Sequence, residues 1–159
     1  MRDIATLSIV LIAAACFSTA ASAAQAGAEA EVEETLQAYE AAWSRHDAAA
    51  IASFFYEPAL RVGRAGPVVR PTRADQEAFF SGFLPGLVQR GYERSRWEEL
   101  NVHLLDAQTA IASGIVVRYR KDGSDLERVA VSYGLRKTER GWKIFLSDTH
   151  APDTVMRFR

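Results

Sequence analysis

The chain has 159 residues, a formal net charge of −1 and a single cysteine. This length favours one domain with a core of ordinary size. The near-neutral charge excludes the strongly basic surface that nucleic acid binding requires, so we expect no nucleic acid partner. The mixture of apolar and charged residues is typical of a globular protein and not of a disordered one.

Residues 1–23 have the pattern of a cleaved signal peptide. Arg2 supplies a positive start, residues 4–17 form an apolar run, and small residues at 21–23 make a cleavage site. We therefore expect export, a periplasmic or secreted mature protein, and no stable membrane association after cleavage. A lipoprotein signal that uses Cys16 is the alternative.

The mature chain of about 136 residues has no cysteine, because Cys16 leaves with the signal peptide, and its stability must come from the core alone. We interpret residues 24–30 as a short linker, 31–152 as the domain and 153–159 as a C-terminal tail.

The first half of the domain has helical periodicity. Val32, Leu36, Tyr39 and Trp43 recur at helical spacing and predict an amphipathic helix. Asp47 is placed to cap a second helix over residues 48–55.

A third helix is predicted after a short hairpin formed by residues 60–62 and 68–70. Thr72 and Asp75 have the spacing of a capping pair at its start. Pro85 is expected to kink or split this helix.

From residue 96 onward the periodicity changes to two. Alternating patterns predict strands over residues 97–104, 111–119, 128–135 and 142–149, joined by short loops. Consecutive strands joined in this way pair antiparallel. The sequence therefore predicts an α+β fold in which a curved antiparallel sheet packs on three N-terminal helices.

Two segments resemble a known family. They are residues 42–47 followed by residues 51–55, and Gly141 to Ile144 followed by Asp148 to His150. They resemble the SnoaL-like branch of the nuclear transport factor 2-like superfamily. The resemblance covers Glu31 to about Pro152 and implies a cone-shaped α+β barrel, often dimeric through its sheet, with a pocket between helices and sheet. We therefore expect a homodimer.

The superfamily includes isomerases, dehydratases, cyclases, epoxide hydrolases and domains without known activity, so the fold does not decide the function. Its ketosteroid isomerases use a tyrosine on the first helix, and the matching position is Tyr39. They place a carboxylate base at the end of the first strand, where this chain has Gly63. An isomerase of that kind is therefore not expected.

Asp148 and His150 form the best acid and base pair in the sequence. Alternation places them on the face of the last strand that also carries Leu146. The carboxylate could orient the imidazole and raise its basicity, which makes Asp148, His150 and Tyr39 the candidate catalytic residues. Alternatively, Asp148 caps a turn or pairs with an arginine while His150 lies at the rim.

Aromatic side chains on the helical faces are available to line a pocket, and an inward-facing strand arginine would select a carboxylate or enolate. The candidate ligand-binding residues are Tyr39, Trp43, Phe54, Phe79, Phe80, Phe83, Arg61 and Arg118. The three histidines are far apart in the sequence and no motif indicates a cofactor, so we expect neither a metal nor a cofactor.

The leading hypothesis is an exported pocket domain that binds a small, largely apolar molecule. One alternative is a small lyase, isomerase or hydrolase that uses the pair of Asp148 and His150 in the pocket. Another is a dimeric interaction module whose pocket is filled by side chains. An open cavity that contains Asp148 or His150 would favour the enzyme, and a filled interior would favour the module.

Overall fold

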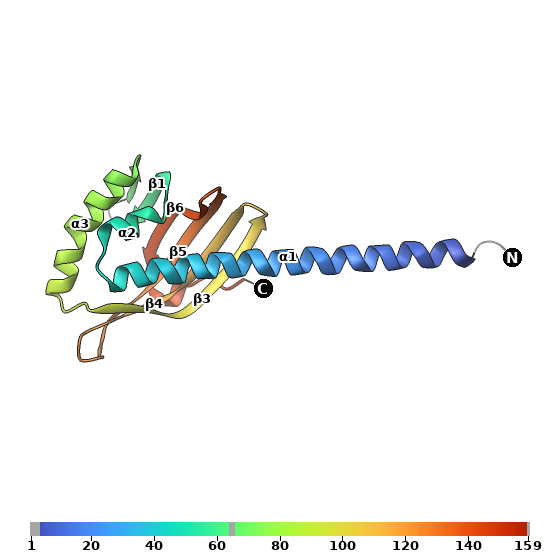
Figure 1. The fold of residues 1–159 in the computed structure, drawn as a ribbon. Coiled ribbons are helices and arrows are strands. Elements are labelled where there is room, and N and C mark those ends of the chain that lie inside the picture. The colour runs from blue at the N-terminus through green and yellow to red at the C-terminus, as the bar shows by residue number, and fades with distance from the viewer. Residues whose placement is uncertain (1–3, 64–65, 159) are drawn as a thin grey trace.

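The computed structural model describes residues 4–63 and 66–158, with side chains from residue 24 onward. Its helices lie on one side of a curved sheet (Figure 1). They are α1 (Ile4–Ser44), α2 (Ala48–Ser53) and α3 (Arg73–Gln89). Residues 24–30, which we expected to form a linker, belong to α1, because this alanine-rich segment has a strong helix propensity. The side chains of the expected signal peptide lie outside the described part of the chain.

The predicted helix starts are confirmed. The carboxylate of Asp47 accepts a hydrogen bond of 2.9 Å from the backbone N–H of Ala50 and caps α2. Thr72 and Asp75 form a reciprocal capping box at the start of α3. Pro85 lies inside α3 and does not split it.

The six strands form one mixed sheet in the order β2-β1-β6-β5-β4-β3. They are β1 (Phe55–Gly63), β2 (Gly66–Arg70), β3 (Arg94–Asp106), β4 (Thr109–Tyr119), β5 (Asp125–Thr138) and β6 (Gly141–His150). The predicted fold class is confirmed, with one unexpected pair, because β1 and β6 run parallel. Since α3 separates β2 from the meander β3 to β6, the last strand returns beside β1 in the same direction.

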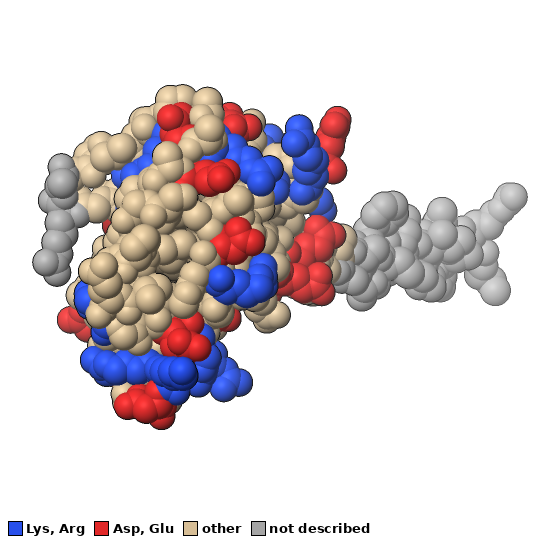
Figure 2. All heavy atoms as spheres, turned by 60° about the vertical axis from the view of Figure 1, so that its left-hand side comes forward, with Lys and Arg blue, Asp and Glu red and all other residues tan. Residues whose placement is uncertain are grey.

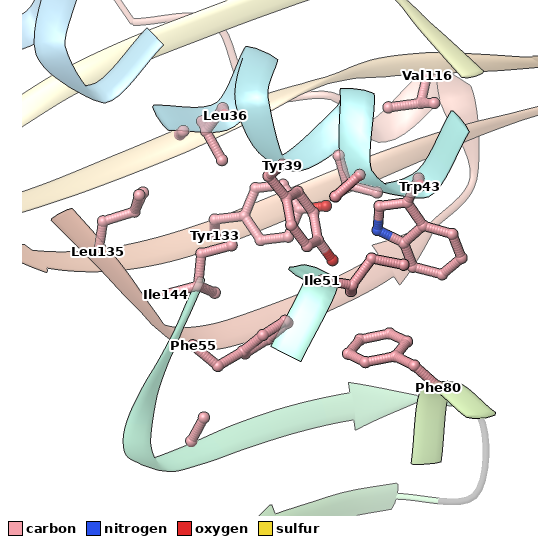
Figure 3. Close-up of a cluster of buried hydrophobic side chains, with 14 of the residues drawn as sticks. Leu36, Tyr39, Trp43, Ile51, Phe55, Phe80, Val116, Tyr133, Leu135 and Ile144 are labelled. Atoms are coloured by element: carbon pink, nitrogen blue, oxygen red, sulfur yellow. The ribbon is translucent and has the colours of Figure 1, made fainter. Parts of the chain in front are cut away.

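The core lies between α1 and the inner, concave face of the sheet. Val32, Leu36, Tyr39 and Trp43 are each at most 9% exposed, so the predicted stripe of the first helix is confirmed. Tyr133 packs against this stripe from β5, with an interplanar angle of 87° to the ring of Tyr39 (Figure 3). The stripe therefore orients α1 along the sheet.

Two β-bulges change which side chains face the core. In β3, Trp97 pairs with Val116 and Glu99 pairs with Ile115, so Glu98 is the extra residue. Strict alternation predicts that Trp97 shares a face with Glu99 and Asn101, and this was wrong, because the bulge turns Trp97 to the inner face.

The second bulge lies in β6, where Ile144 pairs with Leu135 and Leu146 pairs with Gly134. Phe145 is therefore the extra residue, and every side chain after it moves to the opposite face from the one that strict alternation predicts. Strict alternation predicts that Trp142, Ile144, Leu146, Asp148 and His150 share one face, and this expectation was wrong for the last three residues.

The charged surface has no dominant sign on the face that Figure 2 shows, where acidic and basic side chains are interspersed between uncharged areas. This distribution agrees with the formal net charge of −1.

Candidate functional site

A cavity of about 130 Å³ lies between the helices and the inner face of the sheet. An engineered cavity of about 150 Å³ accommodates benzene, so the enclosed space is close to the size of one aromatic ring. Its lining side chains come from α1, α3 and all strands except β2, and they are Tyr39, Glu40, Trp43, Arg61, Phe83, Ser95, Trp97, Val116, Arg118, Val129, Val131, Tyr133, Ser147 and Thr149. A hollow of about 420 Å³ shares Glu40 and Trp97 with the cavity, so these two residues stand between the interior and the surface.

Aromatic rings in edge-to-face contact form one wall of the cavity. The centroid of the Trp43 ring lies 6.3 Å from that of Tyr39 and 6.1 Å from that of Phe83, with interplanar angles of 90° and 85°. Such contacts fix the orientation of the rings. The wall is therefore a rigid apolar surface.

Tyr39 and Tyr133 place two hydroxyl groups at this wall, and in Figure 3 both hydroxyls point toward the side where Trp43 lies. Burial raises the pKa of both tyrosines, that of Tyr133 well above its ordinary value. Each of the two hydroxyls also acts on the pKa of the other, raising that of Tyr133 and lowering that of Tyr39. Both residues line the cavity, and a tyrosine O–H can donate a hydrogen bond to a bound molecule.

Two arginines bring positive charge to the cavity from opposite sides, Arg61 from β1 and Arg118 from β4. Arg118 is held by Glu127 at 2.5 Å, and its guanidinium lies 5.5 Å from the centroid of the Trp43 ring. Arg61 lies 5.0 Å from the ring centroid of Phe79. Among the described residues, Arg61 has no carboxylate within ion-pair distance, so its charge remains available for a bound anion.

Glu40 supplies the carboxylate of the cavity. It accepts a hydrogen bond of 3.2 Å from the Ser44 hydroxyl and is partly buried. Burial raises its pKa, and the hydrogen bond and the charges of Arg96 and Arg94 oppose this shift without cancelling it. Within the described part of the chain, no cation lies within salt-bridge distance of Glu40.

The structure places five of the eight predicted ligand-binding residues in the cavity wall, namely Tyr39, Trp43, Phe83, Arg61 and Arg118. The other three lie behind this wall. Phe80 packs 5.3 Å from Trp43, Phe79 stacks on Phe83 at 5.7 Å, and Phe54 lies 5.7 Å from Tyr39. These three rings support the wall and do not line the space.

Asp148 and His150 do not reach the cavity, because the Phe145 bulge turns them to the outer face and brings Ser147 and Thr149 inward in their place. Asp148 pairs in register with Ser132, whose side chain also points outward. The expected grouping of Asp148, His150 and Tyr39 in one pocket is therefore not formed.

His150 instead belongs to a hydrogen-bond chain that holds the C-terminal segment against the outer face. Its Nε2 lies 2.8 Å from the Ser132 hydroxyl, and its Nδ1 lies 2.7 Å from the Thr154 hydroxyl. Ser113 continues the chain, 3.2 Å from Ser132, and accepts a hydrogen bond from the backbone N–H of Met156 at 3.1 Å. This arrangement gives His150 a structural role on the outer face.

Sequence reasoning missed Glu40, Tyr133, Ser147 and Thr149. Glu40 directly follows Tyr39 in the helix, so its closeness to the apolar stripe was visible in the sequence. Ser147 and Thr149 could not be found, because the bulge that turns them inward leaves no signal in the alternation.

Within residues 24–63 and 66–158, no three histidine, cysteine or acidic side chains are grouped closely enough to hold a metal ion. In the part of the chain that the structure describes, no helix is both long and apolar enough to cross a membrane.

Comparison with known proteins assigns the family. The family model described as NTF2-like protein (DUF6841) matches residues 29–152. The chain belongs to this NTF2-like family. The resemblance to the nuclear transport factor 2-like superfamily is thereby confirmed. No curated protein matches the sequence.

Solved structures show the same NTF2-like fold. An NTF2-like protein with a cystatin-like fold from Novosphingobium aromaticivorans is 18% identical, with a TM-score of 0.67 over 97% of this chain and 93% of that one. An NTF2-like protein of unknown function from Pseudomonas putida is 15% identical, with a TM-score of 0.64 over 80% and 88%. Aln2 from a Streptomyces species is 17% identical, with a TM-score of 0.64 over 78% and 90%. At these identities the similarity establishes the fold alone.

Proposed function

We propose that this NTF2-like protein binds a small, largely apolar molecule with an anionic oxygen in its central cavity. The observation that carries this proposal is Arg61, a cavity-lining guanidinium without a carboxylate partner among the described residues. A partly buried cation without a counter-charge is costly, and a bound carboxylate or enolate would offset that cost.

The rest of the lining agrees with a ring-sized anion. The aromatic wall of Tyr39, Trp43 and Phe83 offers apolar contact to a planar body. The Tyr39 hydroxyl and the guanidinium of Arg118 supply further donors for an oxygen. Sites of this kind, mostly apolar with a few convergent polar groups, are typical of small-molecule binding.

Two probes of nearly the same shape test the proposal. Phenylpyruvate carries a carboxylate where phenylacetone carries a methyl group, so the pair isolates the contribution of the charge. We expect the wild-type protein to bind phenylpyruvate about 10 to 100 times more tightly, because a charge-assisted hydrogen bond contributes about 1.5–3 kcal/mol. Quenching of Trp43 and Trp97 fluorescence, or calorimetry, measures both affinities.

Arg61→Met should remove most of this preference and leave phenylacetone binding nearly unchanged. Arg140→Met is the matched control, because Arg140 is exposed in the turn between β5 and β6 and should have no effect. Equal affinity of the wild-type protein for both probes would contradict the anionic part of the proposal. Failure to bind either probe at millimolar concentration would contradict the cavity as a binding site and favour an interaction module.

We also propose that the protein acts after export, in the periplasm or outside the cell. The support is the apolar run over residues 4–17 and the small residues at 21–23.

A further inference from the structure

We propose that Glu40 is a general base that removes a proton from carbon next to a carbonyl group of the bound molecule. This inference rests on the proposed binding function and adds a reaction to it. Three features of Glu40 support it: its place in the cavity wall, its lack of a salt-bridge partner among the described residues, and its position beside hydrogen-bond donors.

The position of Glu40 gives its carboxylate access to a ligand in the cavity. It lies one residue after Tyr39 and three before Trp43 on α1, and all three side chains line the cavity. Glu40 also borders the neighbouring hollow that it shares with Trp97, so a molecule entering from that side passes it. The carboxylate is therefore at the entrance to the space in which the apolar part of the ligand would lie.

The immediate surroundings keep this carboxylate reactive. Ser44 donates its hydroxyl proton to Glu40 Oε1 at 3.2 Å, which orients the group without neutralising it. Glu127, the acid that contacts the cavity residue Arg118, is not free in this way, because it forms ion pairs with both Arg90 and Arg118. Burial raises the pKa of Glu40 above its ordinary value of 4.5, which makes it a stronger base than an exposed glutamate.

The proposed step balances without an oxidant or a cofactor. The Glu40 carboxylate takes a proton from the carbon, the C–H electron pair forms a carbon–carbon double bond, and the carbonyl π pair moves to the oxygen. The resulting enolate oxygen is stabilised by hydrogen bonds from Arg61 or Arg118 and from the Tyr39 hydroxyl, which are donors at the cavity wall. Protonated Glu40 then returns a proton to carbon, on the same atom or on a conjugated one.

Exchange of carbon-bound hydrogen tests the step directly. Phenylpyruvate has acidic protons on the carbon between its ring and its carbonyl group, and NMR in D₂O follows their replacement by deuterium. We expect wild-type protein to accelerate this exchange above the buffer rate. Glu40→Gln should lower the protein-dependent rate about a hundredfold or more, because a general base typically contributes about 10² to 10⁴.

The Glu40→Gln variant separates catalysis from binding. Its amide oxygen can still accept the Ser44 hydrogen bond, and the loss of a negative charge should leave phenylpyruvate affinity the same or higher. Glu34→Gln is the matched control, because Glu34 is exposed on the same helix and does not line the cavity. In the wild type the protein-dependent exchange rate, measured above the buffer rate, should rise with pH as Glu40 loses its proton. In Glu40→Gln this protein-dependent rise should be absent.

The outcomes for binding and for catalysis are distinct. If wild-type protein binds phenylpyruvate but exchange stays at the buffer rate, or if Glu40→Gln exchanges as fast as wild type, the role of Glu40 is overturned and the binding proposal stands. If phenylpyruvate does not bind, the binding proposal fails, and the role of Glu40 falls with it.

Discussion

At the scale of single residues, Glu40 is the group whose position conflicts with stability. A carboxylate that loses contact with water is stabilised less in its charged form, and the Ser44 hydrogen bond and the charges of Arg96 and Arg94 compensate only part of this loss. Strained or destabilised positions of this kind are frequent at functional sites. The cavity therefore contains a carboxylate whose burial is only partly compensated.

This conflict predicts a pH-dependent gain in stability for Glu40→Gln. Because the pKa of Glu40 is higher in the folded protein than in the unfolded chain, the folded state binds more protons between the two values. The stability that Glu40 contributes is therefore fully present at pH values below its pKa in the unfolded chain. It is lost as the pH rises through its pKa in the folded protein. We expect the variant to have a slightly higher melting temperature than wild type at pH 7, and no advantage near pH 4. A melting temperature at pH 7 that is lower than that of wild type would contradict this.

At the scale of helices and strands, periodicity predicted most elements, and the two bulges mark where it failed. The buried stripe of α1, both helix caps and the alternation along β4 and β5 were all visible in the sequence. A bulge adds one residue to one strand and depends on the neighbouring strand, so no local pattern shows it. Glu98 and Phe145 are such residues, and for this reason Trp97, Asp148 and His150 were assigned to the wrong face.

The same limit applies to the candidate site. The arginines and three of the aromatic residues in the cavity wall could be named, because they depend only on helix periodicity and on unbroken alternation. The acid and base pair of Asp148 and His150 could not be placed correctly, because it lies after the Phe145 bulge.

The Glu98 bulge makes a glycine necessary at position 114. It brings the Glu99 carbonyl oxygen to within 2.2 Å of where a Cβ atom of residue 114 would lie, and Trp97 Cζ3 to 2.9 Å. Since a backbone oxygen cannot move aside as a side chain can, we expect Gly114→Ala to lower the unfolding free energy by about 1–3 kcal/mol. Urea denaturation measures this change.

Gly82→Ala is the control for that experiment. Gly82 lies inside α3 with open space around its missing Cβ, so alanine there should stabilise the protein by up to about 1 kcal/mol. Equal stability of Gly114→Ala and wild type would show that the β3 bulge relaxes freely.

At the scale of the whole molecule, the two faces of the sheet pack against different parts of the chain. The inner face and the helices enclose the cavity, whereas the outer face holds the C-terminal segment. Val155 is buried there with Ile115 and Ala130, and Arg157 pairs with Glu99 at 2.7 Å. Among the residues of α1 whose side chains the structure describes, Ala28 is the first that packs against the core.

This architecture predicts that the protein folds without residues 1–23 and without any disulfide bond. All core contacts of α1 that the structure describes, from Ala28 onward, lie after the proposed cleavage site, and Cys16, the only cysteine of the sequence, precedes that site. We expect mass spectrometry of the exported protein to find Ala24 as the first residue. A variant that starts at Ala24 should have the same unfolding free energy with and without reductant, because no thiol remains to be oxidised. An exported protein that retains residues 1–23, or that carries a lipid on Cys16, would show that the chain is processed by another route.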